Sequence, residues 1–74
     1  MPSAKERLEK ARRHVEWGRF VILRQKQLIE KFRAEGRDTA AADQLLLVLE
    51  RTQKVLEYDL ADLERRNRLL SRSG

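Results

Sequence analysis

The chain has 74 residues, 17 of them basic and 12 acidic, which gives a net charge of +5. Charged residues make up 39% and hydrophobic residues 41%, with three glycines and one proline, a composition typical of long amphipathic helices. There is no cysteine, which excludes disulfides and thiolate metal sites. Because so short a chain has no room for an enclosed active-site cleft, we expect one domain (1–74) that is not an enzyme.

No segment has the length or composition of a membrane anchor. The longest apolar run, Leu45–Leu49, is far shorter than the roughly 20 residues of a membrane-spanning helix. Residues 1–6 contain no apolar stretch resembling a signal peptide. We therefore expect no membrane partner and a cytoplasmic location.

Helix start and stop signals divide the chain into two long helices. Ser3, followed three residues later by Glu6, fits a capping box at the start of a helix. Gly36 can adopt the left-handed conformation that ends a helix. Asp38 or Thr39 can then cap a second helix, ahead of three alanines. We predict a helix over 3–35, a turn over 36–38 and a second helix over 39–70.

Residues at alternating spacings of three and four form a coiled-coil seam in each predicted helix. The first seam contains Leu8, Ala11, Val15, Gly18, Ile22, Gln25, Ile29 and Phe32. The second seam contains Ala42, Leu46, Leu49, Gln53, Leu56, Leu60, Leu63, Asn67 and Leu70. Two such seams in a short chain predict an all-α fold, an antiparallel two-helix coiled-coil hairpin.

Charges beside the seams indicate how the two helices are aligned. Antiparallel pairing matches basic residues with acidic ones as Arg12–Glu64, Arg19–Glu57, Lys26–Glu50 and Arg33–Asp43. We call these four pairs the charge ladder. The core register that we derive with it places Leu8 beside Leu70, Gly18 beside Leu60 and Gln25 beside Gln53. Two glutamines in one layer can hydrogen-bond to each other and disfavour slipped alignments.

A second set of apolar residues lies beside the seam, on the side opposite the charge ladder. We call it the apolar face, and it consists of Trp17, Val21, Leu28, Leu45, Val48 and Val55. An exposed patch of this kind invites association, and a two-helix hairpin buries little surface alone. We predict a structural or protein-interaction module that self-associates, most simply as a homodimer forming a four-helix bundle. The alternatives are a monomer, a trimer, and a further protein partner that covers the face.

Positive charge gathers near both ends of the chain. Residues 1–13 hold five basic and two acidic residues, and 64–72 hold four basic and one acidic, so a hairpin brings +6 together at its open end. We call the following residues the basic patch: Arg7, Lys10, Arg13, Arg65, Arg66 and Arg68. The alternative function is that of a small basic nucleic-acid-associated protein. Because no aromatic residue is interleaved and no DNA-binding motif is present, a solvated helix end is the favoured interpretation.

Residues with catalytic or metal-binding chemistry are sparse. His14 has no metal-ligand companions at helical spacing, where Lys10, Ala11, Trp17 and Gly18 stand instead. The chain has no phosphate-binding loop and no nucleophile elbow. We predict no catalytic, metal or cofactor site.

The spacing of His14, Gly18, Gln25 and Thr52 around the turn Gly36–Thr39 resembles that of a group of short bacterial proteins. These proteins have a Gly-x-Asp-Thr turn between two amphipathic segments, and the likeness covers roughly residues 14–52. The group has no assigned activity. The resemblance therefore implies a bacterial, cytoplasmic helical hairpin and transfers no functional residues.

Overall fold

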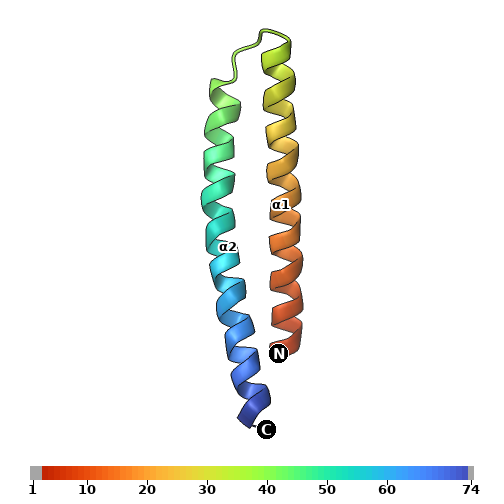
Figure 1. Ribbon diagram of the computed structural model, residues 1–74, viewed down its shortest axis with the longest axis vertical. Helices are drawn as coiled ribbons and strands as arrows, with labels where there is room; N and C mark the ends of the chain where they lie inside the picture. The colour runs from red at the N-terminus through yellow and green to blue at the C-terminus, as the bar shows by residue number, and fades with distance from the viewer. Residues whose placement is uncertain (1–2, 74) are drawn as a thin grey trace.

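The computed structural model describes the backbone of residues 3–73 and the side chains of residues 3–71. It contains two helices, α1 (Ala4–Ala34) and α2 (Ala40–Ser73), which run antiparallel side by side (Figure 1). The described part of the chain has no strand, so the predicted all-α helical hairpin is confirmed. The hairpin measures 59 × 19 × 15 Å, and α2 continues three residues past the end predicted at 70.

The predicted caps form at both ends of α1. The Ser3 hydroxyl accepts a hydrogen bond of 3.1 Å from the backbone N–H of Glu6. At the other end, Gly36 adopts the left-handed conformation with φ of 72°. The backbone N–H groups of Gly36 and Arg37 then donate to the carbonyls of Arg33 and Phe32, the two bonds of a Schellman motif. The Arg37 guanidinium also lies over the Phe32 ring, 5.4 Å from its centre.

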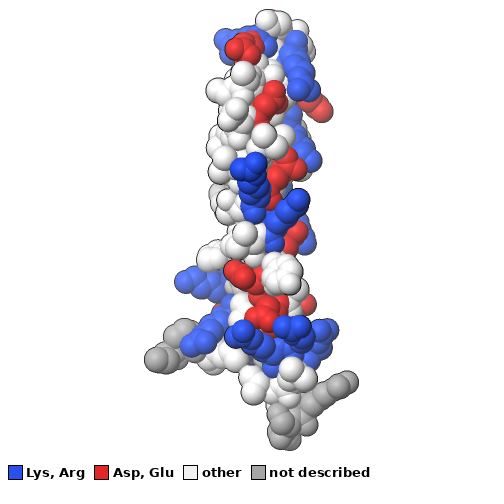
Figure 2. Space-filling model, turned by 90° about the vertical axis from the view of Figure 1, so that its left-hand side faces the viewer, with Lys and Arg blue, Asp and Glu red and all other residues white. Residues whose placement is uncertain are grey.

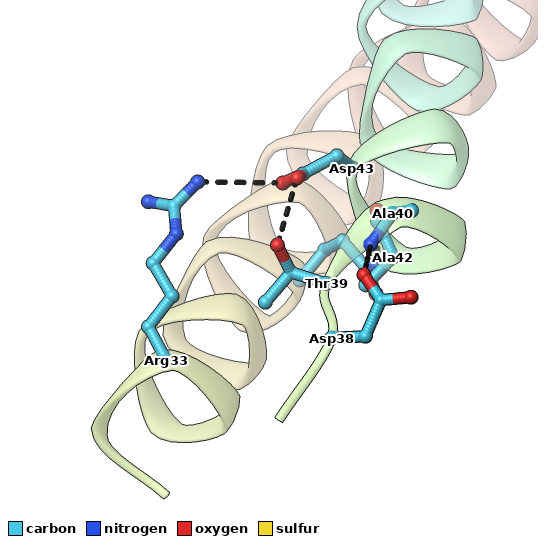
Figure 3. Close-up of polar contacts among 7 residues, drawn as sticks. Arg33, Asp38, Thr39, Ala40, Ala42 and Asp43 are labelled. Carbon is cyan, nitrogen blue, oxygen red and sulfur yellow. Dashed lines mark hydrogen bonds and ion pairs between the residues drawn. The ribbon is translucent and has the colours of Figure 1, made fainter. Parts of the chain in front are cut away.

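Two neighbouring residues start α2, as Figure 3 shows. Asp38 Oδ1 accepts from the backbone N–H of Ala40 at 3.0 Å. The Thr39 carbonyl accepts the first helical bond, and its hydroxyl donates to Asp43 Oδ2 at 2.9 Å. Asp43 also faces Arg33 across the turn, at 3.7 Å. Both caps therefore fix the first residue of α2 at Ala40.

The buried interior of the hairpin is small. Among the described residues, the buried apolar side chains are those of Leu8, Val15 and Ile29, all on α1. Most of the other seam residues are half-buried. Leu70 is 62% exposed, so its predicted place beside Leu8 in the core is wrong.

The buried seam also contains two glutamines, Gln25 and Gln53. The predicted bond between them does not form, because each side chain instead donates to a backbone carbonyl of the opposite helix. Gln53 Nε2 donates to the Val15 carbonyl at 2.9 Å, and Gln25 Nε2 donates to the Ala42 carbonyl at 3.0 Å. In the described part of the chain, no buried side-chain nitrogen or oxygen lacks a hydrogen-bond partner.

Gly18 makes room for one of these glutamines. A Cβ atom added at Gly18 would overlap Gln53 Oε1 and would lie 2.8 Å from its Cδ. The predicted register is therefore wrong, since Gly18 lies beside Gln53 and not beside Leu60. Residues at one height along the hairpin have numbers adding to about 71, one heptad away from the predicted value of 78.

The charge ladder nonetheless forms with the predicted partners in three of its four pairs. Arg19 Nε donates to Glu57 Oε1 at 3.1 Å, and the Arg12–Glu64 and Arg33–Asp43 pairs close at 3.9 and 3.7 Å. No ion pair joins Lys26 to Glu50 among the described side chains. All these side chains are partly exposed, so each pair contributes about 1 kcal/mol or less.

The path of the loop sets the observed register, and the length of the arginine side chains explains why the charge ladder is compatible with both registers. Residues 37–39 run back along α1 before α2 begins, so α2 starts below the end of α1 and its last turns extend past the start of α1 (Figure 1). Arginine side chains point toward the N-terminus of their helix and reach about one turn along it. The charge ladder therefore closes in the observed register as well as in the predicted one.

Candidate self-association face and basic end

The residues of the apolar face stand on the surface of the single chain. Five of the six are 40% (Leu28) to 65% (Trp17) exposed, and the sixth, Val21, is half-buried. Val48 and Val55 on α2 are also more than half exposed. An apolar surface of this kind, contributed by both helices, is more than the scattered exposed leucines of ordinary monomers.

Phe20 lies on the same surface, beside the six residues of the apolar face. Its ring packs against that of Trp17, with ring centres 5.5 Å apart, and it is 50% exposed. Phe20, Val21 and Leu28 also line a shallow hollow of about 460 Å³, together with Arg24 and Gln25. The spacing of three residues between Trp17 and Phe20 is the signal that identifies the pair, because such residues are neighbours on a helix.

The surface area of the chain supports the same interpretation. A compact monomer of 8.8 kDa exposes about 4,800 Å² by the usual scaling of surface with mass, whereas this chain exposes 6284 Å². The excess follows from the elongated shape and from the thin layer between two helices. Part of this surface is apolar, because eleven large hydrophobic side chains of the described residues are exposed.

The basic patch lies at the open end, where the two termini are (Figure 1). All six of its residues are exposed, and Figure 2 shows lysine and arginine side chains gathered toward that end on the α2 side. Two of them are already paired within α2. Arg65 Nη2 and Arg66 Nη2 lie 2.7 and 2.9 Å from the two oxygens of Asp62. The carboxylate of Asp62 thus neutralises part of the charge on this side of the patch.

A shallow hollow of about 360 Å³ lies beside these arginines. Tyr58, Ala61, Asp62, Arg65 and Arg68 line it. One of the lining groups is the Asp62 carboxylate, which already pairs with two arginines, so the hollow is a poor receptor for an anion.

The histidine and the acidic side chains form no metal-binding cluster in the part of the chain that the structure describes. His14 is exposed, and no group of three or more His, Asp or Glu side chains in the described residues is placed to hold a metal ion. Neither described helix contains an apolar stretch of the length that a membrane span requires.

Comparisons with known proteins give no relative. The chain matches no protein-family model, no curated protein and no solved structure.

Proposed function

We propose that this chain is a self-associating helical module whose apolar face binds the same face of a second copy. One observation carries the proposal. Among the described residues, three apolar side chains are buried whereas eleven large hydrophobic ones are exposed. A water-soluble fold arranged in this way leaves its larger apolar area outside, and a second hairpin covers that area as a four-helix bundle.

The available area is sufficient for a stable contact. A typical specific interface buries about 800 Å² on each partner, and this chain exposes about 1,500 Å² more than a compact monomer of its mass. Burial of apolar area contributes about 25 cal/mol per Å², so a few hundred Å² on each copy supplies several kcal/mol. A hairpin with so small an interior depends on a contribution of that size.

Nucleic-acid binding at the basic patch is the second candidate. The exposed cations at the open end support it, whereas the Asp62 ion pairs and the lack of an interleaved aromatic residue weaken it. Salt distinguishes the two candidates, because binding to phosphates weakens steeply as salt rises and apolar contact does not. A non-catalytic role, a cytoplasmic location and a bacterial source stay predictions.

Sedimentation velocity of three proteins tests the proposal at micromolar concentration. Wild type should sediment as a dimer. Val48→Lys places an ammonium group in the proposed contact at the height of Arg24, with no carboxylate to pair it, so it should sediment as a monomer with lower helicity and a lower, concentration-dependent melting temperature. Ala61→Lys is the control, because it adds the same charge to an exposed position well round α2 from Val48 and should leave the dimer intact.

A wild-type chain that stays monomeric and well folded at that concentration would contradict the proposal. Equal loss of association in both variants would point to general charge repulsion instead. Salt-sensitive binding of a DNA oligonucleotide by all three proteins would favour the basic patch.

A further inference from the structure

We infer that the second copy packs with its turn at the same end, so that α1 of each copy lies on α2 of the other. The inference rests on the proposed self-association and adds the geometry of the contact. Its evidence is the distribution of charges along the two borders of the apolar face, read at the heights that the observed register assigns.

The register gives each residue of the face a neighbour at its own height. Because Gln53 lies beside Gly18, Val55 stands at about the height of Trp17, and Leu45 at about that of Leu28. Toward the open end, the face continues into polar residues. Lys10 and His14 on α1 stand at about the heights of Asp62 and Asp59 on α2.

Two symmetric alignments place one apolar face on another. A two-fold axis along the hairpin keeps both turns at one end and lays α1 on α2 of the second copy at equal height. An axis across the hairpin puts the turns at opposite ends and lays α1 on α1 and α2 on α2.

The first alignment brings apolar residues of the two copies together and places a basic residue against an acidic one. It places Trp17 on Val55 and Leu28 on Leu45 of the second copy, and each Arg24 then lies at the height of a valine, Val48, and not of a second arginine. It also places the Lys10 ammonium group against Asp62, and the His14 ring, as a hydrogen-bond donor, against Asp59 of the second copy. Such pairs fix the alignment and exclude other partners more than they add affinity.

The second alignment brings like charges together. Its centre lies midway between Trp17 and Leu28, where the two copies of Arg24 meet in the middle of the apolar contact. Asp59 then faces no cation, and Lys10 lies near Glu35 of the other copy, a carboxylate that already pairs with Arg37. Desolvating two facing guanidinium groups without a carboxylate is unfavourable.

The favoured alignment does bring the two basic patches to one end. Those side chains are exposed, and charges more than about 8 Å apart are largely screened at physiological salt. Asp62 neutralises part of each patch. Contacts within the face therefore decide the orientation.

Spin-label distance measurement on Ala34→Cys tests the inference. The chain has no other cysteine, and Ala34 is exposed at the end of α1, outside the apolar face. With both turns at one end, the two labels lie within about 30 Å, across the width of a four-helix bundle. With the turns at opposite ends, they lie about 40 Å or more apart, because about 23 residues of helical rise separate them.

Each outcome has a distinct meaning. A short distance supports the inference. A long distance overturns the orientation and leaves the proposed self-association standing. Absence of any dipolar coupling between copies, with sedimentation as a monomer, overturns the proposed function itself.

A mixing experiment tests the charge pairs without relying on the label. Asp59→Lys and His14→Glu are both at exposed positions, and each should self-associate more weakly than wild type. In an equimolar mixture the new lysine of one chain faces the new glutamate of the other, so mixed dimers should make up well over the half of all dimers that random pairing gives. A statistical mixture would overturn the assigned pairs. Contacts within one chain cannot produce the preference.

Discussion

The seam between the helices and the apolar face beside it differ in where they place polar and apolar side chains. The seam contains two buried glutamines and a glycine, and it is held by side-chain bonds to the main chain. The face contains tryptophan, leucine and valine, and in the single chain it stands in water. Polar groups placed inside favour one register over others, whereas apolar groups placed outside supply free energy only on association. In this hairpin, burial alone does not reveal where the apolar contribution to stability lies.

The largest expected effect separates seam from face directly. Ile29→Ala removes a buried side chain and should lower the free energy of unfolding by about 2 kcal/mol or more at every protein concentration. Val55→Ala truncates a side chain that is 59% exposed in the single chain, so its effect should be small when the protein is dilute and should grow with concentration. Denaturant titrations at two concentrations measure both variants. A concentration-independent loss of equal size at both positions would remove the distinction.

A smaller effect is expected where the glutamine meets the glycine. Gly18→Ala should lower the free energy of unfolding by about 1–2 kcal/mol, because the new Cβ displaces a buried, hydrogen-bonded carboxamide. In a Gln53→Ala background the same change should be stabilising by up to about 1 kcal/mol, since alanine favours the helix over glycine. Thermal unfolding of the four proteins gives the sign in each background. If Gly18→Ala stabilises the chain that retains Gln53, the contact does not set the register.

The smallest effect concerns the charge ladder. Glu57→Arg should cost little, and adding Arg19→Glu should restore most of the loss, with a coupling energy of about 0.2–1 kcal/mol. The matched control is the same reversal at Lys26 and Glu50, where no ion pair forms and no coupling is expected. Coupling of the same size in both pairs would mean that the ladder acts through net charge and not through contact.

Much of the fold could be predicted from the sequence because its signals are local. Ser3, Gly36 and Asp38 act on backbone groups within a few residues, so the helix ends follow from short-range chemistry. The helical hairpin and three ladder pairs followed from periodicity and charge.

The register could not be predicted, because two alignments one heptad apart satisfy the same seam pattern and the same long arginine side chains. The observed one depends on the path of residues 37–39 and on the fit of Gln53 against Gly18. The side-chain amides likewise have two kinds of partner, another amide or a carbonyl, and pattern alone does not choose between them. The residues of the apolar face could be predicted from their spacing. The molecule that covers the face could not, because that depends on the area and charges of the exposed surface.

The use of main-chain carbonyls by Gln25 and Gln53 has a consequence for mutational drift. Every residue carries a carbonyl, so the side chains at Val15 and Ala42 can change without removing the acceptor, provided the helix persists. The hydrogen bond is lost only when the glutamine itself is replaced. Correlated substitutions at the two ends of these contacts are therefore not expected, and a contact map inferred from covarying positions would miss the interactions that distinguish the register.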